Sequence, residues 1–161
     1  MTEPGRNGRL RIPRKNIRRN DMSKVAVVYW SGTGNTEAMA NAVAEGIRSK
    51  ASDAVMLGPS EFSAGDVANY DAIAFGCPSM GAEVLEEEEF EPMFAAVLPA
   101  LAGKKVGLFG SWGWGGGAWM LDWEQRCRDA GVALVSDGVT CQEYPDADAV
   151  AACKALGASL A

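Results

Sequence analysis

From Lys24 onward, short apolar runs alternate with segments that have helical periodicity. The apolar runs cover residues 25–29, 54–57, 72–75, 106–109 and 132–139. After the first of them, Met39, Val43 and Ile47 recur every four residues, as expected for a helix that packs one face against a sheet. This alternation predicts βαβ units and a parallel sheet that is covered on both faces.

Further helices are predicted over residues 91–102, 117–129 and 146–160, while the segment 65–68 is too short to decide. Gly103 and Gly131 stand where two of these helices should stop. Five parallel strands with helices on both faces are most often wound in the order 2-1-3-4-5, and such sheets bind ligands beyond the carboxyl ends of strands 1 and 3. The predicted fold class is therefore a single doubly wound α/β domain.

Composition and charge divide the chain into two parts. A length of 161 residues suits one domain. The sequence has no apolar stretch long enough to cross a bilayer and no signal-peptide pattern, so we expect a cytoplasmic protein. Residues 1–21 hold seven basic and two acidic side chains, whereas the remainder holds eight basic and nineteen acidic ones. We expect residues 1–22 to be a basic, disordered leader, with Met22 as an alternative start, and residues 23–161 to form the domain. An acidic body repels nucleic acid and membranes and attracts basic partners.

The sequence contains four cysteines and no histidine. Cys77, Cys127, Cys141 and Cys153 form no C-x-x-C pair, which argues against a metal site and against a Cys-His nucleophile. Buried, reduced thiols are the simpler interpretation.

The first predicted strand runs into the first helix through a polar loop that suits a phosphate. This loop is rich in glycine, hydroxyl and amide residues: Ser31, Gly32, Thr33, Gly34, Asn35 and Thr36. Free N–H groups and the positive end of a helix bind anions there. The loop lacks the lysine of a nucleotide P-loop, and Glu37 replaces the third glycine of a dinucleotide loop. The remaining interpretation is a loop that binds a phosphate monoester through neutral donors. The alternative is an ordinary turn in which Asn35 or Thr36 caps the helix.

Two more segments fall at the ends of predicted strands 3 and 4. They read Gly-Cys-Pro-Ser-Met-Gly-Ala-Glu over residues 76–83 and Phe-Gly-Ser-Trp-Gly-Trp-Gly over residues 109–115. Together with the polar loop, these ordered motifs resemble the FMN-binding loops of the flavodoxins of the short-chain, clostridial type. The resemblance runs from about Lys24 to the C-terminus, and the last predicted strand lacks the long insertion of the long-chain branch.

The resemblance implies non-covalent FMN and assigns a site to each motif. The polar loop would hold the phosphate, and Pro78 and Ser79 the ribityl chain. Three residues would contact the ring from the second segment, namely Met80, Gly81 and Glu83. The third segment would contribute Ser111, Trp112, Gly113, Trp114 and Gly115, with Trp114 and Met80 flanking the two ring faces and Trp112 and Trp119 also open to a packing role.

In the family, the Gly81 carbonyl turns toward the flavin when the semiquinone forms, and Glu83 bonds the ring N3–H. The family commonly has Asp or Asn after this glycine. Ala82 departs from that pattern and would cost about 1–2 kcal/mol in a left-handed conformation, which bears on how far the semiquinone is stabilised.

A flavodoxin is a low-potential, one-electron carrier between reductases and acceptor enzymes, so we expect no catalytic residue and no metal. An acidic run predicts that basic-faced redox proteins dock to this protein as a monomer; it consists of Glu83, Glu86, Glu87, Glu88, Glu89 and Glu91. A helix start alone explains about half of these carboxylates.

Two other functions share the fold. A flavodoxin-like NAD(P)H-dependent quinone or azo reductase needs room over the ring, which Trp114 is placed to cover. A signalling receiver domain needs acidic residues after the first strand, where residues 29–31 supply none.

Overall fold

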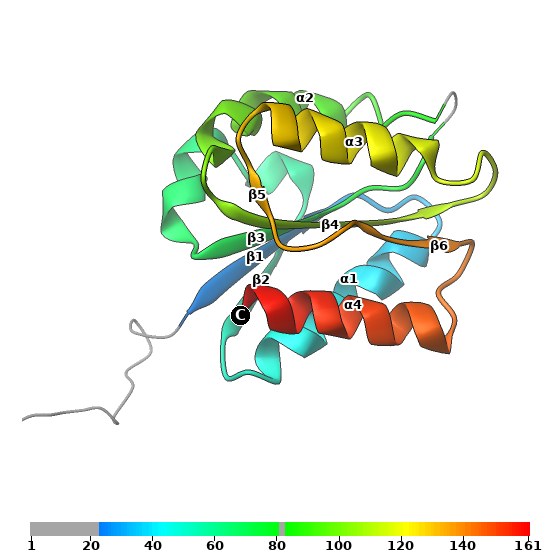
Figure 1. Cartoon of the computed structure of the whole chain (residues 1–161), viewed down its shortest axis with the longest axis horizontal. Coiled ribbons are helices and arrows are strands. Elements are labelled where there is room, and N and C mark those ends of the chain that lie inside the picture. Colours follow the sequence, from blue (N-terminus) through cyan, green and yellow to red (C-terminus); the bar gives the residue numbers. More distant parts are fainter. Residues whose placement is uncertain (1–22, 81–82) are drawn as a thin grey trace, which may run out of the picture.

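A computed structural model of the chain describes residues 23–80 and 83–161, and in this part a parallel sheet lies between two layers of helices (Figure 1). The strands are β1 (Lys24–Tyr29), β2 (Asp53–Leu57), β3 (Ala72–Gly76), β4 (Lys105–Trp112), β5 (Ala133–Leu134) and β6 (Val139–Gln142). The α-helices are α1 (Asn35–Arg48), α2 (Phe90–Val97), α3 (Ala118–Asp129) and α4 (Ala147–Leu160). Three short 3₁₀ helices, η3 (Pro59–Glu61), η4 (Ala64–Asn69) and η5 (Leu98–Leu101), complete the described elements.

The sheet has the order β2-β1-β3-β4-β5 with all pairs parallel, so the predicted fold class is confirmed. One strand differs from the prediction. The last apolar run forms two strands, β5 and β6, which both pair with β4 and are separated by residues 135–138. The Gly138 N–H donates to the Glu124 carboxylate of α3, so the backbone between the two strands bonds to a helix at this point.

Two predicted helices also differ in detail. The helix expected over 91–102 ends as α2 at Val97 and continues as η5, whose second residue is Pro99. Proline has no N–H to donate and its ring crowds the preceding turn, so the α-helical ladder stops there. The undecided segment 65–68 lies in η4, which Ser63 and Asp66 close with a reciprocal cap.

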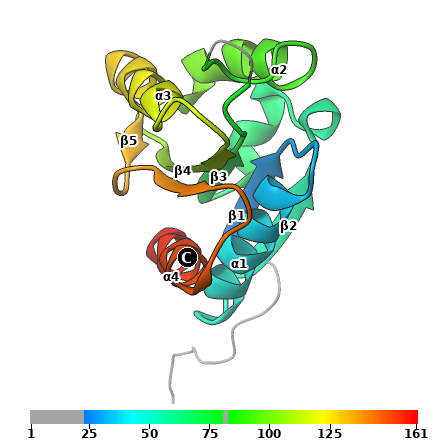
Figure 2. The same ribbon diagram turned by 90° about the vertical axis from the view of Figure 1, so that its right-hand side faces the viewer.

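The sheet has a hydrophobic core on each face, and Figure 2 shows α2 and α3 on one side with α1 and α4 on the other. Phe75, Phe90, Phe94 and Trp123 pack edge to face beneath α2 and α3. Met39, Val43 and Ile47 are fully buried, as their spacing predicts, in the core beneath α1 and α4. Both layers thus anchor helices whose first turns lie beyond the carboxyl ends of the strands.

The helices α1 and α4 approach each other very closely. A Cβ atom on Gly157 of α4 would collide with the Val43 carbonyl, and one on Gly46 of α1 would collide with the Lys154 carbonyl. Glycine at both positions therefore permits the contact between the two helix backbones. Within the described residues, none of the helices has the length and apolar character required to cross a lipid bilayer.

Candidate functional site

The three sequence motifs meet at one cavity of about 260 Å³ beyond the carboxyl ends of β1, β3 and β4. Its walls come from loops that follow these strands, as the strand order predicts. The lining residues are Trp30, Ser31, Gly32, Thr33, Asn35, Thr36, Pro78, Ser79, Met80, Ser111, Trp112, Gly113, Trp114 and Glu143. Twelve of the sixteen predicted site residues are among them.

The polar loop has the shape of an anion cradle. Gly34 is the N-cap of α1 in a left-handed conformation (φ 94°), a role that had been considered for Asn35 or Thr36. The Ser31 hydroxyl oxygen accepts hydrogen bonds from the Gly34 N–H (3.1 Å) and the Glu37 N–H (3.2 Å). Because these two bonds occupy its lone pairs, the Ser31 O–H is left to donate to a ligand. Gly34 itself does not line the cavity; it shapes the loop.

Thr36 provides the test of whether this loop suits a phosphate. Its side chain is only 1% exposed, its hydroxyl has no hydrogen-bond partner in the described part of the chain, and it lines the cavity. Buried hydroxyls almost always have a partner, so an unpaired one at a helix N-terminus marks a place for an acceptor. A phosphate oxygen fits this donor set, which contains no basic side chain.

The described part of the second segment ends in a pair of backbone hydrogen bonds between Met80 and Val84. The Met80 N–H donates to the Val84 carbonyl (2.8 Å) and the Val84 N–H donates to the Met80 carbonyl (3.0 Å). Two predicted positions, Gly81 and Ala82, lie outside the described residues. Pro78, Ser79 and Met80 line the cavity, half-buried.

Glu83 lies outside the cavity wall. Its backbone is left-handed (φ 58°), and its side chain packs against Gly115, another predicted residue that does not line the cavity. One Glu83 carboxylate oxygen is buried without a partner in the described part of the chain. This oxygen is an acceptor without a donor, beside the loop that carries Trp114.

Three of the four tryptophans in the third segment and α3 were considered for the site, and their surroundings differ. Trp114 lines the cavity with 69% of its surface exposed, and Trp112 lines it half-buried. Trp119 is 2% exposed and donates its indole N–H to the Cys77 carbonyl (3.2 Å), so the structure gives it a packing role. An exposed indole beside a cavity suits stacking on a planar ligand.

Two cavity residues were not predicted from the sequence. Trp30 belongs to the polar loop motif, and its ring lies against Gly32. Glu143 follows β6 in a left-handed conformation (φ 59°), and its carbonyl accepts the Ser111 hydroxyl (2.6 Å) while its N–H donates to Trp112 (2.9 Å). Glu143 could have been predicted from its position after the last strand, because the carboxyl ends of all parallel strands lie at the edge of the sheet where the cavity is.

The acidic run has three different environments. The Glu86 side chain is 7% exposed and accepts the N–H groups of Glu88, Glu89 and Phe90 at 2.8 Å. Burial alone would raise the pKa of Glu86, but these three hydrogen bonds outweigh burial, and its pKa is lowered. Glu91 forms a bidentate ion pair with Arg126 at 2.8 and 2.6 Å. Among these carboxylates, Glu87, Glu88 and Glu89 are the exposed ones, which narrows the predicted docking face to these three.

The thiols are mostly buried, as predicted from their spacing. Burial raises the pKa of Cys77, Cys127 and Cys153 to about 12, so these thiols stay protonated and unreactive. Cys141 is only partly buried, which departs from the prediction.

Comparison with known proteins identifies the family. The family model described as Flavodoxin matches residues 27–157. The chain belongs to the flavodoxin family. It is 45% identical to the flavodoxin of Megasphaera elsdenii over 85% of this chain and 98% of the relative. It is also 45% identical to the flavodoxin of Clostridium beijerinckii over 74% of this chain and 87% of the relative.

Solved structures agree with this assignment. The solution structure of two-electron reduced Megasphaera elsdenii flavodoxin superposes with a TM-score of 0.77, at 45% identity, over 84% of this chain and 97% of that one. A flavodoxin from the domain Archaea superposes with a TM-score of 0.73, at 30% identity, over 85% and 95% of the two chains. Flavodoxins carry FMN and are electron carriers rather than enzymes, so the predicted family, cofactor and class of function are confirmed.

Proposed function

We propose that this flavodoxin is a low-potential shuttle that passes single electrons between a reductase and acceptor enzymes in the cytoplasm. The observation that carries the proposal is the single cavity in which the three motifs meet, with an unpaired Thr36 hydroxyl in its wall. When bound there, FMN supplies the redox chemistry, because its ring accepts and releases electrons one at a time. The residues of the chain bind it, orient it and set its electrostatic surroundings.

The polar loop is assigned the phosphate. The Ser31 and Thr36 hydroxyls and the N–H groups at the start of α1 donate to its oxygens. The ribityl chain is assigned to Pro78, Ser79 and Ser111, and the ring to Met80, Gly81, Glu83 and the segment from Trp112 to Gly115. No cation lines this cavity in the described part of the chain, so phosphate binding relies on neutral donors and the helix dipole.

The surroundings favour a low potential. The Glu143 carboxylate lines the cavity, and Glu83 lies beside the loop that contains Trp114. Negative groups at these positions oppose the build-up of further negative charge, which makes the reduced state more costly. The exposed Glu87, Glu88 and Glu89 attract basic-faced redox partners, and the carrier acts as a monomer.

A stepwise anaerobic reduction of the holoprotein tests this function. We expect the absorbance changes of the first and second electron equivalents to differ, because a carrier takes its electrons in separate steps. We also expect no steady NADPH oxidation by the protein alone. Free FMN under the same conditions is the control. Uniform absorbance changes throughout, together with sustained NADPH oxidation, would instead establish the reductase alternative.

A further inference from the structure

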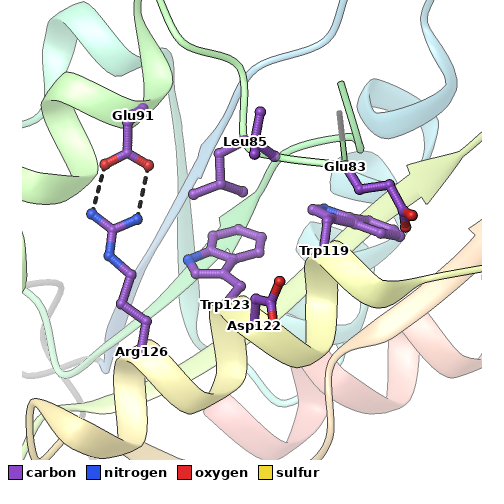
Figure 3. A pocket seen from close by; sticks show the side chains of 8 residues that line it. Glu83, Leu85, Glu91, Trp119, Asp122, Trp123 and Arg126 are labelled. Atoms are coloured by element: carbon purple, nitrogen blue, oxygen red, sulfur yellow. Dashed lines mark hydrogen bonds and ion pairs between the residues drawn. The ribbon is translucent and has the colours of Figure 1, made fainter. Parts of the chain in front are cut away.

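A second cavity, of about 140 Å³, lies between α3 and the segment 83–91 (Figure 3). It is separate from the cofactor cavity, since the two share no lining residue. Its lining consists of Glu83, Val84, Leu85, Glu91, Trp119, Asp122, Trp123 and Arg126. Glu83 also packs against Gly115, which is next to Trp114, so the two cavities are neighbours.

The floor of this second cavity is apolar. Trp119 and Trp123 are 2% exposed and Leu85 is 6% exposed. Figure 3 shows the two indoles rising from α3, with Leu85 above Trp123. The Trp123 indole N–H is buried and has no hydrogen-bond acceptor among the described residues. The floor is therefore dry and holds one donor without an acceptor, and the exposed apolar surface of the cavity comes from Val84, which is 40% exposed.

The rim of the second cavity is negative. Three carboxylates and one guanidinium line it, and Arg126 is already bound to Glu91. Asp122 is exposed, its carboxylate makes no hydrogen bond or ion pair within residues 23–80 and 83–161, and Figure 3 shows it at the foot of the two indoles. Glu83 and Asp122 are thus left without a cationic partner, on a protein whose net charge is −6.

We propose that this second cavity receives a lysine side chain of the redox partner. The inference rests on the proposed function and names where the partner docks. The apolar stem of lysine packs on Val84, above the nearly buried Leu85 and indoles, while its ammonium group pairs with Asp122 and Glu83. A carboxylate would be repelled by the rim, and a bare metal ion would gain nothing from the apolar floor.

Electron transfer to a lysine-rich c-type cytochrome tests the proposal, with Asp122→Asn as the variant and Asp129→Asn as its control. Both aspartates are exposed on α3 and lose the same charge, but Asp129 lies outside the second cavity and contacts Gln125. At low ionic strength, Asp122→Asn is expected to slow the second-order rate by about fivefold and Asp129→Asn by less than about 1.5-fold. Added salt should remove the difference. Equal effects of the two substitutions would overturn the proposal.

Nuclear magnetic resonance of the holoprotein gives a second measurement that does not depend on rates. Adding the diamagnetic ferrous cytochrome should shift the Trp123 indole N–H and the Leu85 methyl signals, and Asp122→Asn should reduce both shifts. Shifts confined to residues 87–89 and 112–115 would overturn the proposed lysine site. If FMN binds normally and Asp122→Asn transfers electrons at the wild-type rate, the lysine site is wrong and the carrier function stands. A protein that binds no FMN would refute the proposed function itself.

Discussion

Thr36 illustrates how a single residue reports on a ligand. A threonine hydroxyl that is 1% exposed normally donates within the protein, yet this one has no partner among the described residues and lines the cofactor cavity. Such a group costs stability while it is unpaired, and under the proposed function a phosphate oxygen would accept its hydrogen bond.

We predict that Thr36→Val weakens FMN binding by about tenfold, since one hydrogen bond to a charged acceptor is lost. Valine keeps the shape of threonine, and the lost hydroxyl has no protein partner, so the apoprotein should not lose stability. Quenching of flavin fluorescence measures the affinity, and thermal unfolding of the apoprotein measures the stability.

Thr140→Val is the matched control, because Thr140 is exposed on β6 and lies outside the cofactor cavity. It should leave the affinity unchanged. An equal affinity of Thr36→Val and wild type would remove Thr36 from the phosphate site.

Glu86 shows that membership of an acidic run does not define a role. The sequence groups it with its neighbours, whereas the structure buries its carboxylate under three N–H donors at the start of α2. Its own N–H bonds the Cys77 sulfur (3.3 Å), which ties the start of α2 to the segment that follows β3. Glu86 therefore stabilises the chain between β3 and α2, and its carboxylate is not free to meet a partner.

We predict that Glu86→Gln lowers the free energy of unfolding by about 1–2 kcal/mol near neutral pH, because an ionised helix cap is lost. Folding lowers the pKa of Glu86, so its stabilising effect is present above the ordinary carboxyl pKa and is lost as the pH falls through the lowered value. The deficit of the variant should therefore shrink in acid. Urea unfolding over a pH series measures it, with the exposed Glu87→Gln as control. A deficit that is independent of pH down to about pH 3 would contradict the assignment.

At the scale of elements, the period of the apolar residues predicts the type and order of the strands and helices correctly. It fails where local chemistry interrupts a continuous pattern. Residues 132–139 look like one strand, but the Gly138 N–H bonds to Glu124 and the strand is split into β5 and β6. Proline 99 likewise changes α2 into η5. Neither the partner of Gly138 nor the exact end of α2 can be derived from hydrophobic periodicity.

The packing of α1 on α4 yields a prediction at this scale. Gly157→Ala should lower the free energy of unfolding by about 1–3 kcal/mol, because the new methyl group meets the Val43 carbonyl and forces the helices apart. Gly65→Ala is the matched control, since a Cβ there meets nothing within 4 Å. Chemical denaturation measures both variants. A neutral Gly157→Ala would show that the two helices separate without cost.

At the scale of the molecule, the parallel sheet brings together loops that are far apart in sequence, from Trp30 to Glu143, since its strands all end at one edge. This is why three motifs could be assigned to one cofactor from the sequence. Glu143 was missed because it belongs to no motif and enters the cavity only through the pairing of β6 with β4. Glu83 and Gly115, which the family resemblance places at the ring, contact each other and do not line the cavity, so their role at the ring stays a prediction.

The sequence alone determined the strand order and the family, because these depend on residue type and spacing along the chain, and it proposed a phosphate loop with no basic side chain. The tertiary structure decided which carboxylates remain free. Glu86 and Glu91 are engaged by a helix start and by Arg126, whereas Asp122, which lies in no acidic run, stands at a cavity beside the cofactor loops. The physical reason is that the charge available to a partner depends on the groups that folding brings next to each side chain.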